Sequence, residues 1–239
     1  MKTNLNRHRL VIFGLLAAFV ATGSMHALRA QNLLVNPGFE DLSGLSLGQT
    51  TFLNSNGYLT VNPGDSTSLR GWSVVNNVLA TPGSSNLDLV TNTFLVHSGT
   101  HAIDLVGTAA GSALGEIQQT VTLNAGTYVL SFFVGHFAGT ADANPYATVS
   151  ISGGALLSQG ITLPSASGIF QQVTIFFNIA TTGNYTLDFS ALRETASNSG
   201  LYLDDVSIMV PEASTIWMAG ITLALVAHFS WKRLRVART

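Results

Sequence analysis

Short β-prone runs separated by turn residues are the feature that most limits how the central part of this chain can fold. Residues 117–123 alternate apolar and polar side chains, and residues 128–135 are apolar on both faces. Gly, Asn, Ser and Pro lie between such runs, and no long segment has helical periodicity. A period of two is typical of a strand with one face covered, and a short apolar run of a strand covered on both. The pattern predicts an all-β sandwich or barrel.

Further strands can be predicted along the same part of the chain. Later ones are expected at residues 147–151, 170–179, 185–191 and 201–209. Earlier ones are expected at residues 33–35, 72–75, 87–90 and 101–106. Residues 42–68 are rich in Gly, Ser, Asn and Thr, which predicts long loops with one strand near residues 58–61.

Charged residues are unevenly distributed along the 239 residues. Residues 31–210 contain eleven acids, two arginines and no lysine, a formal charge of −9, while the other eight basic residues lie near the two ends. Phosphate binding requires clustered Lys and Arg on the folded part, so nucleic acid is not expected as a partner. The chain contains no cysteine, so no disulfide stabilises it.

Residues 1–30 have the three parts of a secretory signal peptide. A basic start is followed by the apolar run 10–20 and by small residues that end at Ala30. This apolar run is too short to span a bilayer, for which about 20 residues are needed. Cleavage after Ala30 is expected, with Ala27 as the alternative, and leaves residues 31–210 as one domain.

Residues 211–239 have the pattern of a membrane-anchoring tail. The apolar run 216–231 is bracketed by two tryptophans and is followed by a basic cluster that includes Arg233 and Arg235. A transmembrane helix is expected at about 216–231, with its basic end in the cytoplasm. The chain would then be exported, with only its C-terminal tip inside.

Pro211, Glu212 and Ala213 precede this helix, and the whole segment resembles the PEP-CTERM sorting signal of bacterial exported proteins. The resemblance implies that an exosortase, a membrane-embedded enzyme, recognises the tripeptide and removes the helix. The protein would then be released to the cell surface or extracellular matrix. Ala213 stands where the family usually has a second proline, and without cleavage the chain would remain a single-span membrane protein.

A second resemblance rests on six short motifs that occur in order along residues 32–206. They are NLLVNPGFE (32–40), GW (71–72), HSGTHA (97–102), QQT (118–120), YVLSF (128–132) and LDDV (203–206). The series resembles the galactose-binding-like domains of the choice-of-anchor C group and the domain-of-unknown-function 642 family. It is similar, more distantly, to family 4/9 carbohydrate-binding modules. The resemblance implies an antiparallel jelly-roll β-sandwich and, by analogy alone, polysaccharide binding.

Glu40 and Asp204 form the candidate metal pair, because the resemblance places the first and last strands side by side. Two adjacent carboxylates repel unless a cation or a donor satisfies them, and calcium takes carboxylate and carbonyl oxygens. The resemblance implies a structural calcium here, with carbonyls of residues 98–101 as further ligands. Alternation places Asp205 on the opposite face, so Asp204 is the preferred ligand. Alternatively, Glu40 caps a turn and Asp204 meets backbone donors or Arg70.

Aromatic side chains are the candidate sugar platforms, since an exposed ring stacks on a pyranose. Trp72 is the only tryptophan of residues 31–210, and its alternative is a place in the core. Other candidates near predicted loops are Tyr58, Phe94, Phe137, Tyr146 and, as a polar ligand-binding residue, His136.

No catalytic residue can be assigned from the sequence. The chain lacks a G-x-S-x-G nucleophile motif, and His97 and His101 would not converge in a turn that enters a strand. No pair of the eleven acids is marked as a glycosidase pair. The predicted function is therefore an exported, non-catalytic β-sandwich that binds or belongs to an extracellular polysaccharide matrix. Two alternatives stay open: a structural, adhesin-like matrix protein without glycan recognition, and an envelope glycan hydrolase.

Overall fold

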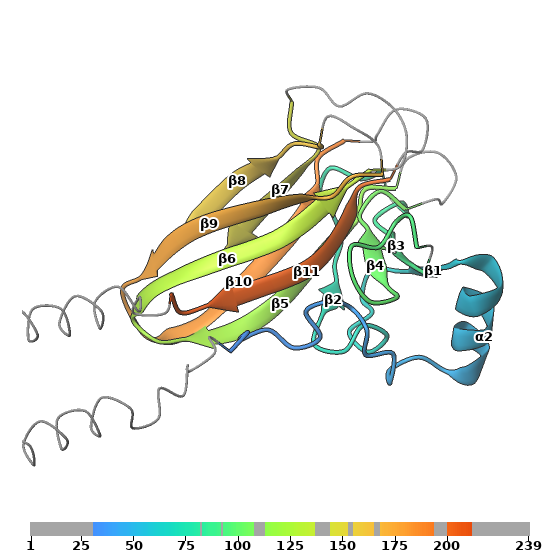
Figure 1. Cartoon of the computed structure of the whole chain (residues 1–239), viewed down its shortest axis with the longest axis horizontal. Helices are drawn as coiled ribbons and strands as arrows, with labels where there is room; N and C mark the ends of the chain where they lie inside the picture. Colours follow the sequence, from blue (N-terminus) through green and yellow to red (C-terminus); the bar gives the residue numbers. More distant parts are fainter. Residues whose placement is uncertain are drawn as a thin grey trace, which may run out of the picture.

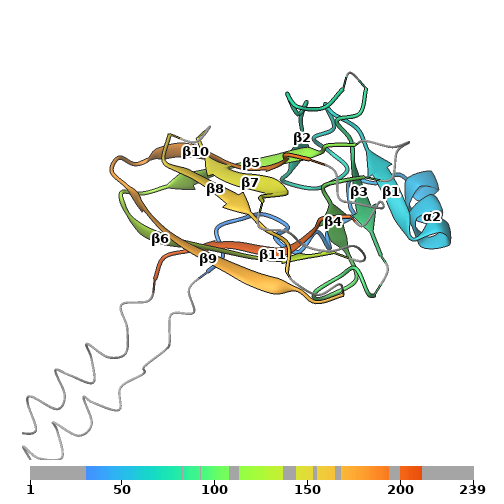
Figure 2. The same cartoon turned by 90° about the horizontal axis from the view of Figure 1, so that it is seen from above.

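The computed structural model describes residues 31–81, 83–91, 93–107, 113–136, 144–152, 155–164, 168–193 and 200–211. They form two antiparallel sheets that pack face to face (Figures 1 and 2). Within these ranges, no helix has the length and apolar character required to cross a membrane. The predicted signal peptide and the tail beyond Pro211, with the helix at 216–231, lie outside the described residues.

One sheet has six strands and the other has five. The six-stranded order is β1 (Tyr58–Val61), β3 (Leu87–Val90), β4 (Ala102–Asp104), β11 (Tyr202–Met209), β6 (Gly126–Gly135) and β9 (Gln171–Ile179). The five-stranded order is β2 (Ser73–Val74), β5 (Glu116–Leu123), β10 (Gly183–Ala191), β7 (Ala147–Ile151) and β8 (Leu157–Ile161). The chain changes sheet at nearly every connection from β4 to β11, which buries the apolar face of each strand between the layers. The prediction of an all-β antiparallel sandwich is confirmed.

A helix was missed in the stretch that was predicted as loops. Helix α2 (Leu47–Asn56) begins after a capping box between Ser46 and Gln49 and ends at Gly57, whose φ of 78° lies in the left-handed region. Only Leu53 of the helix is buried, so the segment lacks the apolar periodicity that predicts helices. The capping box was the available sequence signal. β1, which follows the helix, lies where the sequence predicted a strand.

A β-bulge interrupts β11 at the acidic pair. Asp204 is in register with Phe133, but Ser207 is in register with Ser131, so β11 carries one extra residue. Asp205 has a φ of 50°, a left-handed conformation that Asp tolerates better than most residues. The bulge breaks the alternation on which the preference for Asp204 over Asp205 rested. That expectation is wrong, because both carboxylates contact the same loop.

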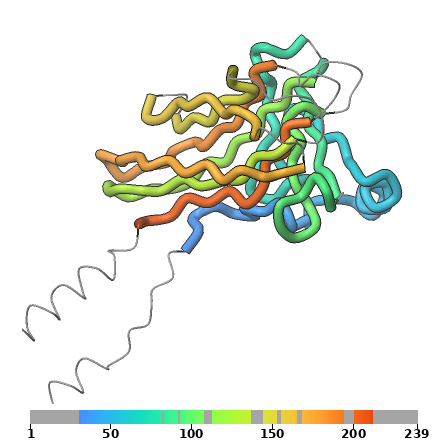
Figure 3. The backbone as a smooth tube through the Cα atoms, turned by 45° about the horizontal axis from the view of Figure 1, so that its top comes forward, coloured from blue at the N-terminus to red at the C-terminus, as the bar shows by residue number. Residues whose placement is uncertain are grey.

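The sandwich has two unlike ends. At the terminal end, made of residues 31–35, 119–130, 174–187 and 206–211, the backbone N–H of Leu33 donates to the carbonyl of Ile208 at 3.0 Å. The first and last described residues therefore lie side by side, as Figure 3 shows. At the loop end, made of residues 36–41, 91–101, 133–136 and 202–205, the long β3–β4 connection covers the start of β11.

Candidate functional site

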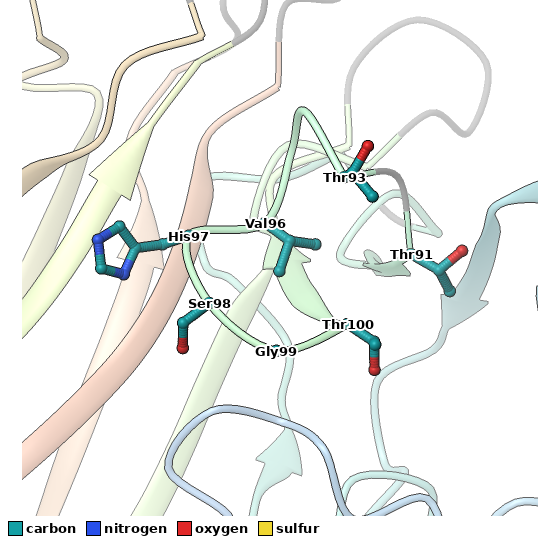
Figure 4. A pocket seen from close by; sticks show the side chains of 7 residues that line it. All are labelled: Thr91, Thr93, Val96, His97, Ser98, Gly99 and Thr100. Atoms are coloured by element: carbon teal, nitrogen blue, oxygen red, sulfur yellow. The ribbon is translucent and has the colours of Figure 1, made fainter.

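A pocket of about 290 Å³ lies at the loop end, within the β3–β4 connection. Its lining residues are Thr91, Thr93, Val96, His97, Ser98, Gly99 and Thr100. Four of the lining residues carry a hydroxyl group, of which those of Ser98 and Thr100 donate to carboxylates outside the pocket. None of the lining residues is a carboxylate, lysine or arginine. Figure 4 shows Val96 pointing into the space that the loop encloses, while His97 points to the opposite side.

Asp204 fixes the first half of this loop. Its Oδ2 accepts hydrogen bonds from the backbone N–H groups of His97 (2.9 Å) and Ser98 (3.1 Å). Its Oδ1 accepts one from the N–H of Asp205 at 2.7 Å. Burial raises the pKa of Asp204 to about 6 and the nearby Asp205 charge adds to this, although the backbone donors act in the opposite direction. Asp204 is thus a buried acceptor for backbone groups that would otherwise lack partners.

Glu40 fixes the second half of the loop. Its Oε1 accepts from the N–H groups of Thr100 (2.7 Å) and His101 (2.9 Å), and its Oε2 accepts from the Thr100 hydroxyl (2.6 Å). Burial tends to raise the pKa of Glu40, but the hydrogen bonds from Thr100 and His101 outweigh it and lower the pKa. Gly99, with a φ of 69°, lies against this carboxylate, and a Cβ there would collide with it.

Asp205 adds a third attachment. Its Oδ2 lies 2.6 Å from Nδ1 of His97, and its Oδ1 accepts from the Ser98 hydroxyl at 2.8 Å. The His97 ring stacks on Phe133, with 3.5 Å between the ring centroids. Side-chain and backbone contacts therefore hold the loop against the outer face of the six-stranded sheet, so the pocket is formed before any ligand arrives.

The contacts of Glu40 and Asp204 do not fit the calcium site that the resemblance implied. Their oxygens face N–H groups and a hydroxyl of residues 97–101, whereas calcium requires oxygen ligands directed at the cation. Among the residues that the structure describes, no group of three or more His, Cys, Asp or Glu side chains could hold a metal ion. The geometry matches the alternative in which Glu40 caps a turn and Asp204 meets backbone donors. Arg70 instead pairs with Asp41 at 2.7 Å.

Trp72 does not form a sugar platform. Its side chain is 1% exposed, its Nε1 donates to the carbonyl of Asn36 at 3.0 Å, and its ring packs against Phe39 and Phe189. The prediction of a stacking role is wrong, because the two sheets enclose the ring. Its alternative, a place in the core, is correct, as expected for a large apolar side chain at the start of a strand.

His136 is also buried, and its Nε2 lies 2.9 Å from the carbonyl oxygen of Pro164. The prediction that it contacts a ligand at the surface is therefore wrong. Tyr58 is half-buried beside Phe52, packs against the same small apolar cluster as Val96, and does not line the pocket.

Phe94 is the exposed aromatic residue next to the pocket. It follows the lining residue Thr93 and is 72% exposed. Of the other platform candidates, Tyr146 is buried and stacks under Arg193, and Phe137 lies outside the described residues. The sequence named Phe94, but it did not predict the surrounding pocket, because loop hydroxyls carry no periodic signal.

Asp104 and Asp188 are two further acids with raised pKa values, but neither has the geometry of a glycosidase residue. Burial raises the pKa of Asp104 to about 7, and its Oδ1 accepts from the N–H groups of Val106 and Leu201, so it has a structural role in the interior. Burial, the Glu116 charge and a hydrogen bond to Glu116 raise the pKa of Asp188. Carboxyl groups that share a hydrogen bond are too close to flank a glycosidic bond, which needs a separation of about 5 Å or more. Neither acid forms a hydrolase site.

No family model and no curated protein matches the chain. Among solved structures, the chain is similar to TmCBM61 in complex with β-1,4-galactotriose, with 18% identity over 76% of this chain and 99% of that chain (TM-score 0.43). It is similar to a family 35 carbohydrate-binding module from Clostridium thermocellum, with 19% identity over 58% of this chain and 92% of that chain (TM-score 0.37). It is also similar to a Family 16 Carbohydrate Binding Module-2, with 17% identity over 54% of this chain and 87% of that chain (TM-score 0.37). These TM-scores are below 0.5, so the similarities establish neither a family nor a ligand for this chain.

Proposed function

We propose that this protein is an exported, non-catalytic β-sandwich that binds extracellular polysaccharide through the pocket of the β3–β4 loop. The observation that carries the proposal is a preformed pocket at the loop end, with Phe94 exposed beside it. The Ser98 and Thr100 hydroxyls already donate to carboxylates, so the hydroxyls of Thr91 and Thr93 are the ones proposed to meet a ligand. Hydroxyls exchange hydrogen bonds with sugar hydroxyls, and an aromatic ring covers the apolar face of a pyranose. A lining without carboxylates, lysine or arginine suits an uncharged polymer.

Rigidity of the loop supports the same proposal. Glu40 and Asp204 each accept two backbone hydrogen bonds from the loop, and Asp205 holds two of its side chains. A site that is ordered before binding loses less conformational entropy when the ligand arrives. This arrangement gives the buried carboxylates a role in binding without direct contact to the sugar.

Export and surface sorting form the second part of the proposal. They are supported by the signal-peptide pattern of residues 1–30 and by the apolar run with its basic tail at residues 216–235. The resemblance to PEP-CTERM signals adds an exosortase as the processing partner. The chain would be anchored through the C-terminal helix until it is processed, and would then belong to the extracellular matrix.

Binding to immobilised polysaccharides tests the proposed function. Wild-type protein should bind at least one uncharged polysaccharide, and Phe94→Ala should weaken that binding about 2- to 13-fold, as expected from losing one aromatic contact of about 0.5–1.5 kcal/mol. Phe176→Ala is the matched control, because Phe176 is 68% exposed but belongs to the terminal end. If both substitutions weaken binding equally, or if neither weakens it, binding at this loop would be contradicted.

A structural, adhesin-like matrix protein is the second candidate. It is favoured by the burial of Trp72 and Tyr146, which removes two of the aromatic platforms that a glycan site would use. This candidate predicts no binding to any polysaccharide tested, while the protein still assembles with other matrix proteins.

A further inference from the structure

The described residues of the terminal end carry no charged side chain. These residues, 31–35, 119–130, 174–187 and 206–211, include no Asp, Glu, Lys, Arg or His. The acids of the same strands lie toward the loop end: Glu116 begins β5, and Asp204 and Asp205 lie near the start of β11. Turns at the terminal end instead expose Thr, Asn, Ala and Gly. In a domain with a formal charge of −9, a charge-free end is a distinct surface.

Both ends of the described chain emerge at this surface. Asn32 and Leu33 hydrogen bond to the end of β11, where the side-chain amide of Asn32 donates to the carbonyl of Val206 at 2.9 Å. The membrane helix expected from the sequence begins at Ile216, which leaves residues 211–215 as the connection. Five extended residues span at most about 18 Å. A helix inserted in a bilayer would therefore hold the terminal end close to the lipid headgroups.

An apolar row lies beside this exit point on the outer face of the six-stranded sheet. Phe176 on β9 is in register with Val129 on β6, and Val129 is in register with Met209 on β11. Cross-strand partners share a face, so the three side chains are neighbours across the sheet. Phe176 is 68% exposed, and Val210, the next residue after β11, is 54% exposed.

We propose that the terminal end, with the row of Phe176, Val129 and Met209, is a membrane-facing surface that lies against the lipid headgroups. The proposal rests on the anchoring part of the proposed function. Anionic headgroups repel acidic side chains, and a charged group that approaches a bilayer loses part of its hydration. An end without charged side chains avoids both unfavourable terms. This orientation directs the pocket away from the bilayer, because β6 alone separates the two ends by about 30 Å.

The absence of cysteine permits a direct test with single labels on the full-length chain. Ala180→Cys places a fluorophore at the exposed turn between β9 and β10, and Val78→Cys, at a position that is 92% exposed, places one near the loop end. Each labelled protein is reconstituted into vesicles of phosphatidylcholine and phosphatidylglycerol that contain a lipid with a nitroxide headgroup. Fluorescence quenching then reports which end lies near the headgroups.

We expect strong quenching at position 180 and weak quenching at position 78, and we expect Phe176→Ser to reduce the quenching at position 180. Equal quenching at the two positions in vesicle-bound protein would overturn the membrane-facing surface. A chain that does not float with the vesicles would also overturn it, and would identify the C-terminal anchor as the incorrect premise. Polysaccharide binding by the same labelled proteins is measured separately, so failure of the glycan site is recognised independently.

Discussion

The loop end and the terminal end are built from the same strands, yet they differ in every respect that concerns binding. At the loop end, Glu40, Asp204 and Asp205 attach a long connection to the sheet, and their oxygens face backbone N–H groups. At the terminal end, strands are joined by short turns, and exposed pairs such as Thr127 and Asn178 supply the polar contacts. The difference shows that one sandwich core supports a preformed pocket at one end and an uncharged surface at the other.

The loop end contains buried acids, whose ionisation is unfavourable in the folded protein. Burial raises the pKa of Asp204 to about 6 and that of Asp104 to about 7, so ionisation of both is disfavoured in the folded protein. Their oxygens accept hydrogen bonds from backbone N–H groups outside regular strand pairing, which would otherwise lack an acceptor. At the terminal end, neutral side chains satisfy the corresponding backbone groups: the Thr182 hydroxyl accepts from the N–H of Ala125, and Oδ1 of Asn32 accepts from the N–H of Ile208.

The largest difference between the ends should appear on removal of Asp204. Asp204→Ala leaves the N–H groups of His97 and Ser98 without their acceptor, so we expect the free energy of unfolding at pH 7 to fall by about 2–4 kcal/mol. Thr127→Ala, which removes one exposed bond to Asn178, should change it by less than about 0.5 kcal/mol. Urea unfolding measures both. Similar decreases in the free energy of unfolding for the two variants would contradict this difference between the ends.

A smaller effect should appear in the pH dependence of stability. Because the folded pKa of Asp104 lies near 7, above about 3.9 in the unfolded chain, the folded state keeps a proton that the unfolded state releases. Stability should therefore fall, by about 2–3 kcal/mol from Asp104 alone, as the pH rises from 5 to 8. Asp104→Asn keeps an oxygen for the N–H groups of Val106 and Leu201, and should reduce this fall. An unchanged pH profile in the variant would assign the fall to other acids.

Sequence patterns predicted most of the strands, but residues 33–35 form no strand and β8 was not expected. The strands β5, β6 and β7 have strong period-two or continuously apolar patterns, and each lies where it was expected. Helix α2 was missed because a helix with one buried residue has no apolar stripe. The bulge in β11 was missed because alternation assumes regular pairing, and the left-handed Asp205 violates it.

The candidate site was predicted less completely. Glu40 and Asp204 were predicted as metal ligands, but in the structure both accept hydrogen bonds from backbone N–H groups of the β3–β4 loop. Which atoms face a carboxylate is set by the fold of a loop that is distant in sequence, and the sequence pattern does not contain that information. Trp72 was assigned a surface role that its burial excludes. The hydroxyls of Thr91 and Thr93 carry no sequence signal, since Thr and Ser occur throughout residues 31–210 of this chain.

Hydrogen–deuterium exchange with and without a bound polysaccharide tests the central claim most directly. We predict that a polysaccharide found in the binding screen slows exchange within residues 91–101 and leaves the turns at 124–126 and 180–183 unchanged. The loop is attached by carboxylates at both halves, so the change should be confined to it and its neighbours. Protection at the terminal end, or on the outer face of the five-stranded sheet with none at residues 91–101, would contradict the assignment of glycan binding to the loop end.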